Sequence, residues 1–114
     1  MSAPVFLCAL DDIPDGGARG FAVTRTGSGA VFAVRRGRSV FIYRDLCPHE
    51  GARLAWRRDA YLSADACRIV CWAHGAHFDI ETGQCVAGPC LGQRLSRVAF
   101  ELEGVGAIHL KGLA

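Results

Sequence analysis

The sequence predicts an all-β protein built from short antiparallel strands. Short runs rich in Val, Ile, Phe and Tyr recur along the chain, and Gly-containing turns separate them. No segment shows sustained helical periodicity. The 114 residues, 51% of them hydrophobic, suffice for one domain with a modest core. We therefore expect a single domain over residues 1–114.

The first half of the chain is expected to contribute four strands. They are Pro4–Leu10, Phe21–Thr24, Ala30–Arg35 and Ser39–Arg44. Segment 11–20 holds one Pro and three Gly residues, which predicts a loop between the first two strands. The last two strands flank residues 36–38 and form the clearest hairpin signal in the chain. Residues 40–43 are apolar without alternation, which predicts a strand buried on both faces.

The second half is expected to continue in short strands. They are Arg68–Cys71, His77–Ile80, Cys85–Val86, Leu95–Glu103 and Ile108–Lys111, preceded by a helical turn at Leu54–Arg58. Residues 81–84 predict a turn, and Gly88-Pro89 ends the strand that follows it.

Two segments each place a thiolate donor beside an imidazole donor. In the first motif, Cys47 and His49 are separated by one residue. In the second motif, Cys71 and His74 are separated by two. Such short spacings allow both side chains of a loop to point at one centre. Two Cys and two His from two loops therefore predict a four-ligand metal site.

The sequences around these residues, CPHEGARL and CWAHGAHFDIETGQCVAGP, resemble the cluster loops of Rieske ferredoxins. The resemblance is close over residues 40–90. It implies a 2Fe–2S cluster with Cys47 and Cys71 on one iron and His49 and His74 on the other. Two thiolates balance the two positive charges of the oxidised cluster core, so an electron enters a neutral site.

The resemblance also implies a Rieske-like antiparallel β-sandwich or barrel. A small cluster-binding subdomain would be inserted in it at about residues 45–86. The 21 residues between His49 and Cys71 exceed the usual spacer of the family. We expect the surplus around Arg57–Asp65, away from the ligands.

Two other interpretations of the four residues remain. They could be ordinary core Cys and His residues, although four donors with matching glycines seldom coincide. They could also bind zinc, which accepts two Cys and two His ligands in a tetrahedron. Finger-type zinc sites pair like with like, whereas each loop here offers one Cys and one His. A visible absorption spectrum distinguishes iron from zinc.

The other cysteines, Cys8, Cys67, Cys85 and Cys90, are predicted to be small apolar residues of the core that can be replaced with the cluster retained. Cys85 and Cys90 could also bridge in an oxidising setting.

Several neighbours of the ligands have two possible roles. His77 is either a structural polar residue or an alternative ligand or proton relay. Trp72 either covers the cluster or mediates electron transfer, and Pro89 is expected in a third, shielding loop. The arginines near the motifs form either a solvated face or a docking cluster for an acidic partner. They are Arg35, Arg36, Arg38, Arg44, Arg53, Arg57, Arg58 and Arg68.

The resemblance further implies a low reduction potential. High-potential members of the family bridge their loops with a disulfide, and the matching positions here are Ala52 and Ala73. Those members also place a Ser and a Tyr hydroxyl against the cluster, where this chain has Ala76 and Phe78. We therefore expect a potential near the bottom of the Rieske range, on the order of −150 mV.

The function implied is that of a Rieske ferredoxin, a single-electron carrier between an NAD(P)H-dependent reductase and a terminal oxygenase. The alternative is the small Rieske subunit of an assimilatory nitrite reductase, and a detached oxygenase domain is a third. No catalytic residue set of its own is expected. The net charge of +2 and the absence of a signal peptide or long apolar run argue against nucleic-acid and membrane binding and favour the cytoplasm.

Overall fold

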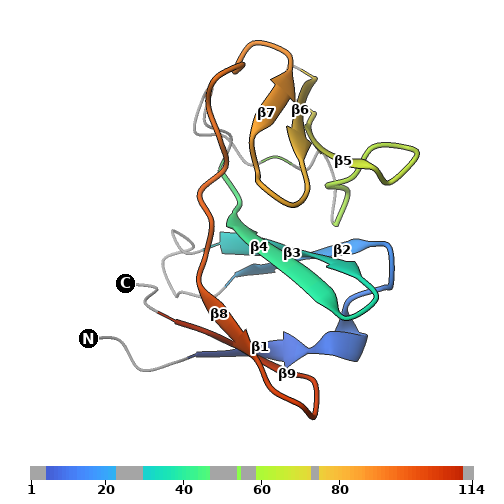
Figure 1. Cartoon of the computed structure of the whole chain (residues 1–114), viewed down its shortest axis with the longest axis vertical. Coiled ribbons are helices and arrows are strands. Elements are labelled where there is room, and N and C mark those ends of the chain that lie inside the picture. The colour runs from blue at the N-terminus through green and yellow to red at the C-terminus, as the bar shows by residue number, and fades with distance from the viewer. Residues whose placement is uncertain (1–4, 23–29, 47–53, 55–58, 73–74, 112–114) are drawn as a thin grey trace.

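A computed structural model of the chain describes residues 5–22, 30–46, 54, 59–72 and 75–111 (Figure 1). These residues form three antiparallel sheets of three strands each, with no α-helix among them. The first sheet contains β1 (Val5–Ala9), β9 (Ala107–Leu110) and β8 (Phe100–Leu102); the second β2 (Ala18–Ala22), β3 (Ala30–Arg36) and β4 (Ser39–Arg44); the third β5 (Arg68–Cys71), β6 (Ala76–Asp79) and β7 (Cys85–Ala87). A 3₁₀ turn, η1 (Leu10–Asp12), follows β1. The predicted all-β class is confirmed.

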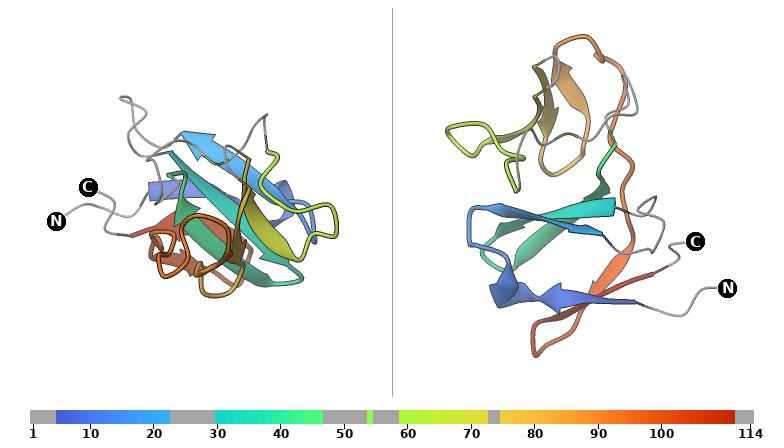
Figure 2. Two further views of the ribbon diagram at one scale, coloured as in Figure 1. Left: turned by 90° about the horizontal axis from the view of Figure 1, so that it is seen from above. Right: turned by 180° about the vertical axis from the view of Figure 1, so that it is seen from behind.

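The β2–β3–β4 sheet lies between the other two sheets (Figures 1 and 2). Strand residues alternate between faces, and here both faces are buried. Val31 and Ile42 face one core, which they share with Ile108 of β9. Phe32 and Tyr43 face the other core, which they share with Phe78 of β6. The prediction that residues 40–43 are buried on both faces is therefore confirmed.

The third sheet lies between β4 and β8 in sequence, so it is an insertion into the fold of the other two. Tyr43 joins it to the middle sheet, because its hydroxyl donates a hydrogen bond to Ile80 O over 2.6 Å. Burial raises the pKa of Tyr43, which keeps the phenol protonated as the donor. Gly83 leaves room for that ring, since a Cβ there would lie 2.7 Å from Tyr43 Cε1.

Most of the predicted strands appear close to their predicted bounds. The hairpin of β3 and β4 pairs Val31 with Arg44 through Arg36 with Ser39, as expected. The strand Arg68–Cys71 has the predicted bounds. The predicted helical turn at 54–58 lies outside the described residues, apart from Leu54.

Two predicted segments differ from the structure. Residues 18–20, predicted as loop, belong to β2, because Ala18 pairs with Val34 and Gly20 with Phe32 across the sheet. Pairing with a long neighbouring strand thus overrides the low strand propensity of Gly.

The second difference is Leu95–Glu103, of which only residues 100–102 form a strand. The preceding part runs between sheets and bonds to each in turn. The Leu95 N–H donates to Gly83 O over 2.8 Å, and the Val98 N–H donates to Ile42 O over 2.9 Å. This segment therefore ties the inserted sheet to the middle sheet without extending either.

Candidate metal centre

Cys71 is the predicted ligand that the structure describes, and it ends β5 in a buried position. Its side chain is 1% exposed, and it pairs with Ala76 at the start of β6. The turn between them is closed by a hydrogen bond of 2.9 Å from the Gly75 N–H to Cys71 O. Gly75 has a φ of +72°, a conformation that favours glycine. Cys71 therefore lies at the end of a buried hairpin that closes through Gly75.

The first motif lies between Asp45 and Leu54, and the structure joins these two residues. The Leu54 N–H donates to Asp45 Oδ1 over 2.9 Å. The Leu54 carbonyl in turn accepts the Trp72 N–H over 3.1 Å. The described residues on either side of the first motif, Asp45 and Leu54, are thus bonded to each other, and Leu54 is also bonded to Trp72. This arrangement brings the described residues that flank the first motif beside the end of β5.

Asp45 carries this link from a buried position. Its side chain is 2% exposed, and its second oxygen accepts the Tyr61 hydroxyl over 2.8 Å. The Tyr61 ring stacks on Phe32 of the middle sheet, with ring centroids 4.4 Å apart. A buried carboxylate is stable only when it is well hydrogen-bonded, so these donors have a structural role.

Replacing Asp45 by Ala should lower the free energy of unfolding by about 2–4 kcal/mol, because two buried donors lose their acceptor. Tyr61→Phe removes one of those donors and should cost about 1 kcal/mol. Asp11→Ala is the matched control, since that side chain is 98% exposed. Urea unfolding of the iron-loaded proteins, followed by circular dichroism, measures all three. Equal stabilities of the Asp45 and Asp11 variants would contradict this role.

Sequence reasoning missed Asp45, Leu54 and Tyr61 as residues that position the site. A signal for Asp45 was present, because an acidic residue directly follows a strand buried on both faces and directly precedes the first motif. Nothing in the local sequence identified Tyr61 as its partner.

The other predicted ligands, Cys47, His49 and His74, lie outside the described residues. The described surroundings suit the predicted cofactor. A buried thiol sits at a hairpin end, and Leu54, which follows the segment with the other Cys and a His, is bonded to the next residue, Trp72. Cys47 and Cys71 would supply the thiolates, and His49 and His74 the imidazoles, that an asymmetric 2Fe–2S cluster requires.

His77 points away from this centre. Ala76 and Phe78 are buried on one face of β6, whereas His77 and Asp79 are half-buried on the other. Because Cys71 is paired with Ala76, its side chain shares a face with Ala76 and not with His77. The geometry supports the structural interpretation of His77 over the ligand interpretation.

Two other neighbours also have defined positions. Trp72 is half exposed, and its Nε1–H donates to Ala60 O over 3.0 Å. Gly88 lies against the backbone of Ala76, where a Cβ would come within 2.8 Å of Ala76 Cα. The 86–89 segment, which contains Pro89, therefore packs beside the second motif.

One arginine of the proposed docking cluster is structural. Arg35 donates to Ile13 O over 3.0 Å and to Gly37 O over 2.7 Å, and it holds the N-terminal loop to the middle sheet. Arg53, Arg57 and Arg58 lie outside the described residues.

A sequence profile of the Rieske [2Fe-2S] domain matches residues 3–105. The chain belongs to the Rieske [2Fe-2S] domain family. The cofactor of this Rieske protein is accordingly the 2Fe–2S cluster that two His and two Cys hold, and it supplies reversible one-electron transfer when bound. None of the curated proteins matches the sequence.

Solved structures agree with this assignment. The fold is similar to the ferredoxin of carbazole 1,9a-dioxygenase from Nocardioides aromaticivorans IC177, with a TM-score of 0.74 and 30% identity over 96% of this chain and 97% of that one. A ferredoxin of Sphingomonas yanoikuyae B1 gives a TM-score of 0.70 and 27% identity over 95% of this chain and 97% of that one. A chain from a complex of reduced oxygenase and oxidised ferredoxin in carbazole 1,9a-dioxygenase gives a TM-score of 0.73. The identity is 26% over 96% of this chain and 93% of that one.

In the described part of the chain, no helix is both long and apolar enough to cross a membrane.

Proposed function

We propose that this Rieske protein is a ferredoxin that carries single electrons to a terminal oxygenase. The observation that carries the proposal is the match, over nearly the full length of both chains, to the ferredoxin of a carbazole dioxygenase. We propose Cys47 and Cys71 as ligands of one iron and His49 and His74 as ligands of the other. The Rieske domain would span residues 1–114, with the cluster-binding subdomain at about 45–86.

We propose that the protein is an electron carrier without a catalytic site of its own. The buried Cys71 and its anchored surroundings serve to hold a redox group. An NAD(P)H-dependent reductase is the proposed electron donor. Several cysteines, among them Cys8 and Cys67, stand outside disulfides, which suits the reducing cytoplasm proposed for the protein.

The surface of the inserted sheet supports transient docking. Four of the six large apolar side chains that are exposed among the described residues belong to it or to the segments beside it: Leu46, Trp72, Val86 and Leu91. Leu46 precedes a proposed ligand and Trp72 follows one. Exposed apolar residues around a redox group are typical of a surface that meets a partner.

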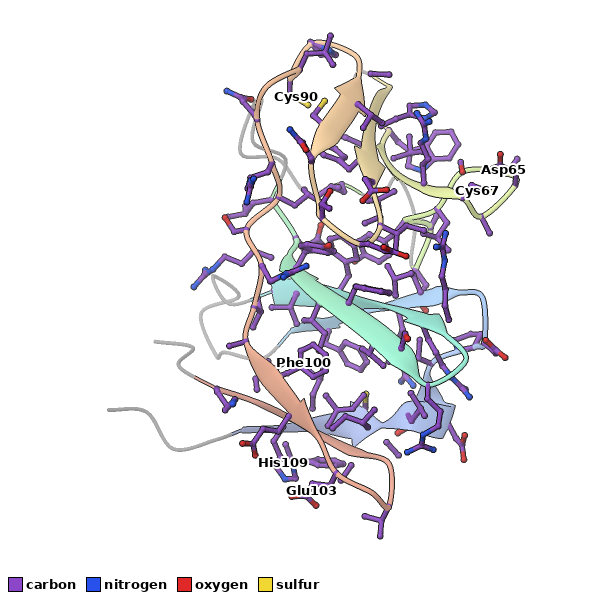
Figure 3. All side chains as sticks on the ribbon, in the orientation of Figure 1. Asp65, Cys67, Cys90, Phe100, Glu103 and His109 are labelled. Carbon is purple, nitrogen blue, oxygen red and sulfur yellow. The ribbon has the colours of Figure 1, made fainter. Side chains whose placement is uncertain are left out.

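Mixing the reduced protein with an oxidised Rieske-type terminal oxygenase in a stopped-flow instrument tests this function. The visible absorption of the carrier should return at a rate that rises with oxygenase concentration. Leu91→Asp should slow this step about tenfold or more, since a charge at an interface core costs well over 1 kcal/mol. Val105→Asp is the matched control, because Val105 is 89% exposed in the turn between β8 and β9, at the other end of the molecule from Cys90 (Figure 3).

Reoxidation that is independent of oxygenase concentration would refute the carrier role. Co-elution of the native protein with a sirohaem nitrite reductase on gel filtration would favour the alternative subunit function instead. Equal slowing by the Leu91 and Val105 variants would refute the docking surface alone.

A further inference from the structure

Two cysteines outside the proposed ligand set face each other inside the inserted sheet. The Cys90 thiol donates to Cys85 Sγ, and the two sulfurs are 2.8 Å apart. Both side chains are buried, at 4% exposure for Cys85 and 1% for Cys90. The S–S bond of a disulfide is about 2.05 Å long, so little movement separates this pair from a covalent bridge.

The backbone holds the two cysteines in this position. The Cys85 N–H donates to Gln93 O, and the Gln93 N–H donates to Cys90 O, each over 2.9 Å. Gln84 and Arg94 form a further bridge just outside this loop. Main-chain bonds therefore close this short loop, and they hold the two thiols beside each other without a covalent bond.

We propose that Cys85 and Cys90 form a reversible dithiol–disulfide couple, a redox modification site separate from the iron ligands. With hydrogen peroxide as oxidant, one thiolate attacks a peroxide oxygen and breaks the O–O bond, which leaves a sulfenic acid and one water. The second thiolate attacks that sulfur, the S–O bond breaks, and the disulfide forms with a second water. The two thiol protons end in the two waters, and a dithiol reductant reverses the reaction.

The bridge would restrain the segment that packs beside the iron site. It would close a ring around residues 86–89, and Gly88 of that ring lies against Ala76, which pairs with Cys71. Oxidation of the pair would thus fix the backbone next to the second motif. Iron can leave only when the backbone around the cluster opens. The oxidised protein should therefore retain its iron longer.

Peptide mapping of the iron-loaded wild type tests the pair directly. After treatment with peroxide, the protein is denatured, alkylated and digested with trypsin. Cys71, Cys85 and Cys90 all fall in the tryptic peptide 69–94. This peptide should carry one alkyl group after oxidation and three after reduction. Apart from the alkyl groups, the bridged peptide should be about two mass units lighter than the reduced one, because a disulfide lacks the two thiol hydrogens.

The other two cysteines outside the ligand set provide matched controls in the same digest. Cys67 is exposed, so the prediction of a core residue is wrong there, whereas Cys8 is buried in the other core as predicted. Burial raises the pKa of the Cys8 thiol to about 11, which disfavours the reactive thiolate. Neither should form a disulfide at a peroxide dose that closes the pair.

Three alkyl groups on peptide 69–94 at every peroxide dose would overturn the proposal, as would a bridge that involves Cys71. Cys85→Ser and Cys90→Ser should each abolish bridge formation. Iron release to a chelator should be several-fold slower in the oxidised wild type and insensitive to peroxide in Cys85→Ser. Equal release rates in oxidised and reduced wild type would refute the coupling to the iron site.

Discussion

Protein-film voltammetry of the iron-loaded protein should give a midpoint potential on the order of −150 mV, against a ceiling of about +300 mV for Rieske centres. The physical reason is that Ala76 and Phe78, which follow the second motif, carry no hydroxyl. Ala76 and Phe78 are both fully buried, on the face of β6 that Cys71 shares. A hydrogen bond to a cluster sulfur or a ligand thiolate withdraws electron density and stabilises the reduced state, and these two side chains cannot donate one.

The double variant Ala76→Ser with Phe78→Tyr should raise the midpoint, since it restores both hydroxyls on that face. Phe21→Tyr is the matched control, because it adds the same hydroxyl to β2, where the ring packs against the other core. A wild-type midpoint potential well above zero would contradict the hydrogen-bond argument. It would also contradict the role as a carrier that receives electrons from an NAD(P)H-dependent reductase. A rise in the Phe21 variant equal to that of the double variant would show that the effect is not local.

The second large effect is expected at the proposed histidine ligands. His49→Ala or His74→Ala should abolish the Rieske visible and electron paramagnetic resonance spectra, because each removes one imidazole from an iron that has two. His77→Ala should leave the spectra intact, since His77 lies on the face of β6 away from Cys71. Iron content per chain, measured on the same samples, separates loss of the cluster from a change in its spectrum.

His109→Ala controls for the effect of removing any half-buried histidine. It lies on β9, at the end of the molecule away from the inserted sheet (Figure 3). A His77 variant without a cluster, beside a His74 variant that keeps one, would overturn the ligand assignment. Loss of iron from the His109 variant would show that general destabilisation, not ligation, controls cluster content.

Residues that are adjacent in the sequence determined the predicted strands and metal-binding motifs. The runs that form β3, β4 and β5 are rich in β-branched and aromatic residues and end at turns, so their bounds follow from neighbouring residues. The metal-binding motifs are likewise local, because a Cys and a His one or two residues apart are already close together. Fold class, cofactor and proposed ligands therefore follow from short segments of the sequence.

Contacts between distant residues depended on the tertiary structure. β2 extends through Gly20 because β3 offers a pairing edge, and Leu95–Ala99 is no strand because it bonds to two sheets in turn. The sulfurs of Cys85 and Cys90 meet because Gln93 closes the loop between them. The carboxylate of Asp45 meets Tyr61 only when the middle sheet stacks the Tyr61 ring on Phe32. A sequence specifies which residues can bind a cluster, but burial and hydrogen bonding across the folded chain decide what holds them in place.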